Sequence, residues 1–254
     1  MILLFFYCLS SAASARDYHL PYIKTIDYIE GVFFDIALKG EYSQLPPVLK
    51  KWEEPLRVWV YQEGDSSNES YYTYLLHRHF RLLSALTGLN IQFESNKALS
   101  NVKVYIAPTQ RLESILLKDF NREVELLGEV VCFGSIRYGL KDAVIKKGFI
   151  FVPSDAFNLN NILPCVIEET TQMLGLLNDS KFARNTIFSD QTPDKYLTGL
   201  DYILLRLMYH PDLKSGMSSV ELSPIIRRQL NKMMLSGELP FAQSYLRMSM
   251  EKLK

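Results

Sequence analysis

The sequence predicts an α/β (α+β) chain that forms one globular domain, or one domain plus appendages. Helical and strand-like segments alternate along it without an internal repeat or a low-complexity linker. The 254 residues are 48% hydrophobic, which is enough to bury a sizeable core without a metal. Because 28 basic residues balance 28 acidic ones, the chain lacks the basic surplus that nucleic-acid binding normally requires, and we expect no nucleic-acid partner.

The N-terminus has the pattern of a secretory signal peptide. An apolar run over residues 2–9 precedes Ala13-Ser14-Ala15, the small-x-small pattern after which signal peptidase cleaves. We therefore expect residues 1–15 to be a signal peptide and the mature protein to be periplasmic or secreted. It would then meet a membrane only through that peptide. An N-terminal core helix is the alternative interpretation.

Hydrophobic periodicity predicts the elements that follow. Apolar residues at helical spacing indicate helices, and alternating ones indicate strands. The predicted helices are 26–37, 71–86 and 111–127, and the predicted strands are 56–61, 89–93, 102–107, 130–136 and 148–152. The polar stretch 63–70 is expected to be a loop, and Thr87-Gly88 to end the second helix.

Two cysteines remain once the signal peptide, with Cys8, is removed. Cys132 and Cys165 would face an oxidising compartment, so we expect a disulfide with the two Cα atoms within about 7 Å. It would fasten the start of the next helix to a preceding strand. Two buried thiols are the alternative.

That next helix is predicted over about 161–176. Asparagines before it can cap its start, and Gly175 lies near the point where it must stop and turn. Its spacing is that of the zinc-peptidase template HExxHxxGxxH, which carries metal ligands at i and i+4 and a general base at i+1. The residues in register are Glu168, Glu169, Gln172, Gly175 and Asn178.

The match keeps the base and the glycine but none of the histidines. Glu169 occupies the general-base position, whereas Gln172 and Asn178 are weak neutral donors where zinc sites use imidazole, thiolate or carboxylate. We therefore expect no zinc and no cofactor. The simplest alternative makes Glu168, Glu169 and Asp179 surface or capping acids, with the two amides holding the turn.

The downstream sequence is similar to metzincins, a branch of the zincins. Residues 185–190 stand where metzincins carry their methionine turn, with Ile187 or Phe188 in place of the methionine. Thr198 and Asp201 then predict a capping box that opens a final helix, and Tyr209 closes the pattern.

From about Phe33 to Met217 the chain also resembles a family of exported bacterial proteins of unknown function. The hallmark Cys-x-x-Glu-Glu-x-x-Gln-x-Leu-Gly-Leu-x-Asn-Asp reads CVIEETTQMLGLLND here, from Cys165 to Asp179. The resemblance implies a zincin-like fold over residues 16–220, a mixed twisted sheet packed against helices. Residues 221–254 would be a C-terminal helical extension.

Three functions fit these residues. We favour a non-catalytic binding or scaffolding protein of the cell envelope, whose cleft holds an extended polypeptide or envelope polymer along an edge strand. The second is a peptidase- or glycosidase-like hydrolase with Glu169 as general base. The third is a carboxylate site for a harder ion such as calcium or manganese. The expected cleft residues are Glu168, Glu169, Gln172, Gly175, Asn178 and Asp179.

Overall fold

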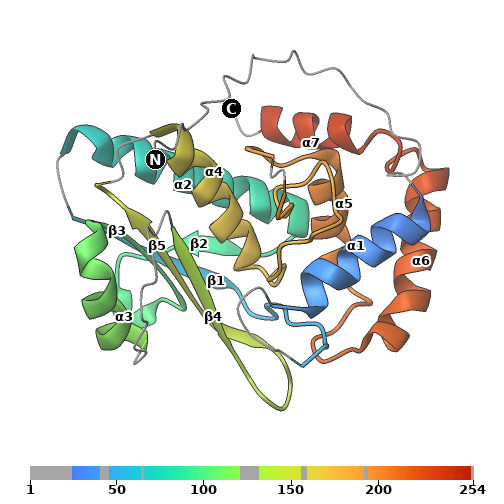
Figure 1. Cartoon of the computed structure of the whole chain (residues 1–254), viewed down its shortest axis with the longest axis horizontal. Coiled ribbons are helices and arrows are strands. Elements are labelled where there is room, and N and C mark those ends of the chain that lie inside the picture. The colour runs from blue at the N-terminus through green and yellow to red at the C-terminus, as the bar shows by residue number, and fades with distance from the viewer. Residues whose placement is uncertain are drawn as a thin grey trace, which may run out of the picture.

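The computed structural model describes residues 25–40, 46–63, 66–120, 132–155, 159–191 and 194–252. The predicted signal peptide, residues 1–15, lies outside these ranges. Within them a five-stranded mixed sheet packs against seven α-helices (Figure 1). The predicted α/β class, with a mixed sheet packed against helices, is confirmed.

The sheet is parallel except for one edge. Its strand order is β2-β1-β3-β5-β4, and only β4 runs antiparallel to its neighbour. Parallel neighbours need crossover connections, and α2 makes the one between β1 and β2. The strands are β1 Leu56–Gln62, β2 Ile91–Phe93, β3 Val102–Ala107, β4 Phe133–Tyr138 and β5 Ile145–Pro153.

The helices follow the predicted segments with differences at the bounds of α2 and α4. Residues 121–127 of the predicted helix 111–127 and residues 130–131 of the predicted strand 130–136 lie outside the described residues. α2 begins at Ser66, so the loop predicted for 63–70 is wrong from that residue onward, because serine and asparagine suit the first turn of a helix as well as a loop. α4 ends at Gln172, four residues before the predicted end. The helices are α1 Ile26–Leu38, α2 Ser66–Thr87, α3 Leu112–Phe120, α4 Leu159–Gln172, α5 Gly199–Met208, α6 Ser219–Leu235 and α7 Ala242–Glu251.

The two faces of the sheet contribute to two cores. Along β3, Val102, Val104 and Ile106 enter the main core, whereas Tyr105 and Ala107 enter a smaller core beneath α3, as the twofold alternation of a strand requires. α2 and α4 cover the face opposite α3 (Figure 1). The main core continues through α1 and the C-terminal helices.

The two ends of the described chain meet in a helical layer. α6 packs on α1, where Ser223 donates a hydrogen bond to Glu30 and Arg227 pairs with Glu30 and Asp27. α6 begins at Ser219, two residues before the predicted extension 221–254, and α7 follows it. In the described ranges no helix is both long and apolar enough to cross a membrane.

Candidate functional site

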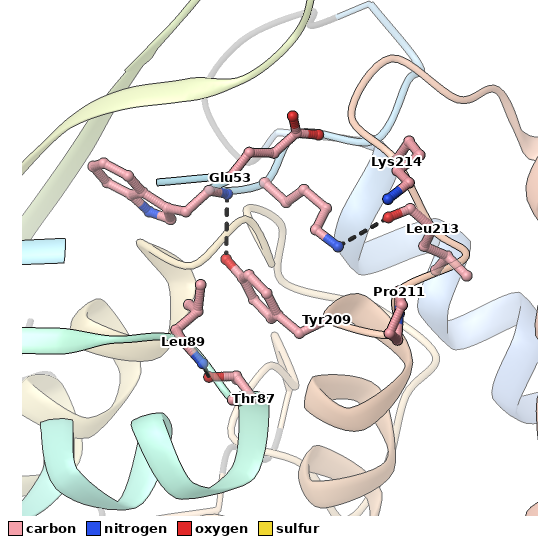
Figure 2. Close-up of a pocket in the computed structure, with 10 residues that line it drawn as sticks. Glu53, Thr87, Leu89, Tyr209, Pro211, Leu213 and Lys214 are labelled. Carbon is pink, nitrogen blue, oxygen red and sulfur yellow. Dashed lines mark hydrogen bonds between the residues drawn. The ribbon is translucent and has the colours of Figure 1, made fainter. Parts of the chain in front are cut away.

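The end of α4 is set by side chains from distant parts of the chain. Trp52 donates its indole N–H to the Met173 carbonyl at 2.9 Å, and the Tyr209 hydroxyl donates to the Leu174 carbonyl at 2.7 Å. The Tyr209 oxygen also accepts from the Trp52 backbone N–H at 3.4 Å (Figure 2). These bonds take the carbonyls that a longer helix would use internally, so α4 stops.

The backbone beyond the turn is taken up by α1. The N–H groups of Leu177 and Asn178 both donate to the Ile36 carbonyl, at 3.0 and 3.2 Å. Gly175 makes the change of direction with φ +112°, and a Cβ atom there would overlap the Lys50 carbonyl oxygen. A glycine is therefore required at this position.

The predicted cleft residues divide into two groups. Gln172 donates its side-chain amide to Asp179 Oδ1 at 3.0 Å, and the Asn178 amide donates to the carbonyls of Asp35, at 3.2 Å, and Asp179, at 2.9 Å. Both amides thus hold the chain that leaves α4, and Asn178 also fastens it to α1. We call Glu168, Glu169, Gln172, Asn178 and Asp179, which are all half-buried, the α4 polar cluster.

Glu169 points toward the sheet. A Cβ atom on Gly134 would overlap its carboxylate, so the acid lies directly against edge strand β4. Glu168 is half-buried one turn before Gln172 on the same helix face. The structure therefore joins Gln172, Asn178 and Asp179 through hydrogen bonds and places Glu169 beside β4.

Of the histidines that the structure describes, two lie on α2. His79 on α2 is buried against α4, with Nε2 3.1 Å from Thr171 Oγ1, and burial lowers its pKa to about 4. His77 stacks on Phe93. His19 lies outside the described residues. Among the residues that are described, no group of three or more His, Cys, Asp or Glu side chains could hold a metal ion.

The turn at Ile187 and Phe188 is buried and follows the cluster in the chain. Ile187 and Phe188 are both buried, and the Phe188 carbonyl accepts from the Ser180 N–H at 2.8 Å, directly after Asp179. The turn is joined to α5 by Asp201, which accepts from Thr186 and Ile187 and forms the predicted capping box with Thr198. Burial raises the pKa of Asp201 to about 6.

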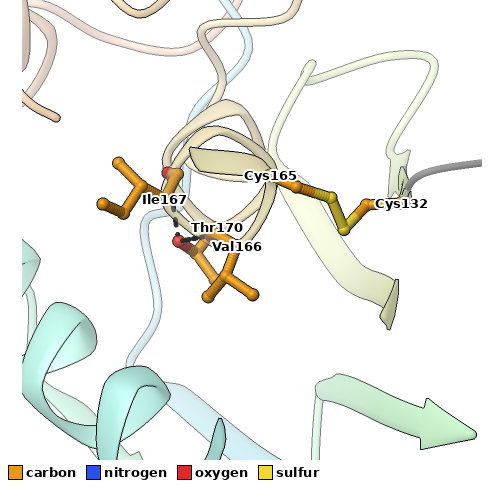
Figure 3. Close-up of a disulfide and its surroundings, with 5 residues drawn as sticks. All are labelled: Cys132, Cys165, Val166, Ile167 and Thr170. Atoms are coloured by element: carbon orange, nitrogen blue, oxygen red, sulfur yellow. Dashed lines mark hydrogen bonds between the residues drawn. A yellow bond between two sulfur atoms is a disulfide. The ribbon is translucent and has the colours of Figure 1, made fainter. Parts of the chain in front are cut away.

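The predicted disulfide is present and links α4 to β4. Cys132 directly precedes β4, Cys165 lies in the middle of α4, and their Cα atoms are 6.0 Å apart (Figure 3). Cys165 projects toward the strand, while Val166, Ile167 and Thr170 point to the other side of the helix (Figure 3). The cross-link therefore holds the helix that carries Glu169 against the edge strand.

Sequence reasoning missed a polar pocket of about 380 Å³ between the end of α2 and the end of α5 (Figure 2). We call it the Lys51 pocket. Its residues come from three distant chain segments, so no local pattern could have indicated it. They are Lys51, Trp52, Glu53, Thr87, Gly88, Leu89, Tyr209, Pro211, Leu213 and Lys214.

Comparison with known proteins identifies a family but no activity. No curated protein matches the chain at a significant level. A family model described as "Protein of unknown function (DUF2927)" matches residues 27–228, which include the sheet, α4 and the turn after it. The match covers most of the chain, and the protein therefore belongs to the DUF2927 family.

Proposed function

We propose that this protein is an exported, zincin-like binding protein of the cell envelope that holds an extended polypeptide beside α4 without cleaving it. The observation that carries the proposal is the way the turn after α4 is fixed. Trp52, Tyr209 and the amide of Asn178 hold by hydrogen bonds the segment in which a zincin would place its ligands. A frame held in this way needs no metal.

The position of β4 supports an extended ligand. β4 is the last strand in the sheet order, and extended peptides commonly bind by adding a strand at such an edge. Glu169 and the disulfide hold α4 against this strand, so a chain added at the edge of β4 would run alongside the strand that Glu169 contacts. The Ala13-Ser14-Ala15 pattern and the disulfide both favour an oxidising compartment outside the cytoplasm.

The decisive experiment combines metal analysis with peptide capture. The purified protein is analysed for bound metals, then mixed with a library of ten-residue peptides, and bound and free peptides are examined by mass spectrometry. We expect no stoichiometric metal, a retained subset of peptides, and no cleavage products. Glu169→Gln should retain the same subset, because it keeps the shape and hydrogen bonding of the side chain.

A glycine pair locates the binding site. Gly134→Ala should displace the Glu169 carboxylate, the flexible end of a side chain, and weaken peptide binding by about tenfold. Gly31→Ala in α1 is the matched control, since nothing lies within 4 Å of the added methyl group. If the two variants bind peptides equally well, the peptide-binding site does not lie at β4.

Two outcomes would replace the proposal. If any peptide is cleaved and Glu169→Gln abolishes that cleavage while stability is unchanged, the protein is a hydrolase with Glu169 as its general base. A stoichiometric hard cation that disappears in the same variant would make the cluster a metal centre.

A further inference from the structure

The Lys51 pocket contains a buried ammonium group with spare hydrogen-bonding capacity. A lysine ammonium has three N–H donors, and within the described chain the Leu213 carbonyl, at 2.9 Å, is the one acceptor bonded to Lys51 Nζ. The same nitrogen lies 5.0 Å from the centre of the Tyr209 ring. The residue is only 7% exposed, so little solvent reaches it except from the pocket.

The charges around the pocket favour an anion. Lys214 adds a second positive charge at the rim, and Glu53 supplies one negative charge. Glu53 is already engaged by the Ser215 backbone N–H at 3.2 Å. Figure 2 shows Glu53 and Lys214 on the same side of the pocket, with Tyr209 below them. The lining therefore has a net charge of +1 when both lysines are protonated.

The remaining walls would hold the body of an organic molecule. Leu89, Pro211 and Leu213 are apolar, and Tyr209 adds an aromatic ring. A cavity of about 380 Å³ falls within the range of small-molecule sites, which combine apolar walls with a few polar groups that fix orientation. The turn at Gly88 leaves one side open, because nothing lies within 4 Å of a Cβ atom built there.

We propose that the Lys51 pocket binds a small organic anion, with the Lys51 ammonium holding its carboxylate or phosphate group and the Leu89–Pro211 side holding an apolar body. This site lies outside the α4 polar cluster, and none of its lining residues belongs to α4 or β4. The inference therefore does not depend on the function proposed above.

The neighbouring lysine shows what a purely structural buried ammonium looks like. Lys50 is fully buried, and its Nζ donates to two carbonyls, Pro46 at 2.6 Å and Val48 at 2.9 Å. It also lies over the ring of Tyr138. Burial lowers the pKa of both lysines to about 8. Lys50 has two acceptors and is not among the pocket residues, whereas Lys51 has one acceptor and faces the pocket.

Three probes of similar shape test the proposal. Benzoate, phenyl phosphate and neutral benzyl alcohol are titrated into the isotope-labelled protein, and binding is followed by the amide NMR signals of Gly88, Leu89 and Lys214. We expect one or both anions to shift these signals and to bind at least about tenfold more tightly than benzyl alcohol, because a charged hydrogen bond is lost with the alcohol. The ratio of benzoate to phenyl phosphate affinity identifies which oxyanion the site prefers.

Three lysine variants then test whether the Lys51 ammonium is the group that binds the anion. Lys51→Met keeps the apolar stem and should weaken anion binding about tenfold or more, whereas Lys50→Met is the matched control and should leave it within about twofold. Lys214→Gln changes an exposed side chain at the rim, so the protein folds normally, and it should weaken binding about threefold. The Lys214 variant remains informative if either buried-lysine variant is unstable.

The proposal is wrong if benzyl alcohol binds as tightly as the two anions, or if the shifted signals lie away from the Lys51 pocket. It is also wrong if Lys214→Gln and Lys51→Met, both folded, bind the anions like the unaltered protein.

Discussion

The middle of α4 and its C-terminal exit are held in place by different chemistry. Cys165 is bonded covalently to Cys132 ahead of β4, whereas the exit is held by hydrogen bonds from Trp52 and Tyr209 and by close packing at Gly175. A disulfide stabilises mainly by restricting the unfolded chain, and close packing acts in the folded state. The disulfide depends on redox conditions, whereas the hydrogen bonds and packing at the exit do not. Each attachment can therefore be broken separately.

The largest effect is expected at the exit. Gly175→Ala places a methyl group against the Lys50 carbonyl oxygen and Met208 Cε, at a φ of +112° that alanine rarely adopts. Backbone strain and overpacking together should lower the free energy of unfolding by about 4–5 kcal/mol, measured by urea denaturation.

Gly88→Ala separates strain from packing. This residue has φ +74°, but nothing lies within 4 Å of the added methyl group. We expect a loss of only about 1 kcal/mol, because only the left-handed backbone is penalised. Similar losses for the two glycine variants would show that close packing at the exit is unimportant.

Breaking the covalent attachment should cost slightly less. The bond joins residues 33 apart in sequence, and the chain-entropy relation for a loop of this length gives about 3–4 kcal/mol. We expect reduced protein to remain folded with correspondingly lower stability in urea, since the core is formed without the cross-link. A protein with both Cys132 and Cys165 replaced by serine should be insensitive to the reductant.

Thiol titration provides the independent check. Non-reduced mature protein should contain no free thiol at Cys132 or Cys165, and two titratable thiols there would contradict the cross-link.

His79 tests the contact between α2 and α4, with a smaller effect that depends on pH. Its folded-state pKa of about 4 lies below the ordinary value near 6.5, because burial disfavours the charged ring. Its contribution is therefore fully present above pH 6.5 and is lost as the pH falls toward 4. At pH 4 and below, the loss should approach about 3 kcal/mol.

The measurement compares pH profiles of unfolding free energy. His79→Gln should be flatter between pH 6.5 and 4 than the unaltered protein, while His77→Gln, at an exposed position on the same helix, should change the profile less. Parallel profiles for the unaltered protein and His79→Gln would mean that the ring is not buried in its neutral form.

Sequence patterns correctly predicted several features that depend on residues close together in the chain. β3 was predicted at its observed bounds because its apolar residues form a short run ended by Pro108, and the Thr198–Asp201 capping box needs residues only three apart. The disulfide was predictable because only two cysteines remain after the expected signal cleavage. Gly175 was predicted to turn the chain, and its positive φ agrees.

Contacts between distant segments explain what was missed. Trp52 meets Met173 across 121 residues and Tyr209 meets Leu174 across 35, so periodicity could not place either bond or the resulting end of α4. The Lys51 pocket was missed for the same reason, because its lining residues come from distant segments of the chain. A pair of adjacent lysines looks like a solvated surface in sequence, and only the fold buries both.

The packing of α6 on α1 has a practical consequence for producing the protein. The family match ends at residue 228, which is in the middle of α6. A recombinant protein truncated there would lose Leu230, Met233 and all of α7, and would uncover the apolar surface of the helices beneath them. For expression and crystallisation, the C-terminal boundary therefore belongs after α7, near residue 252.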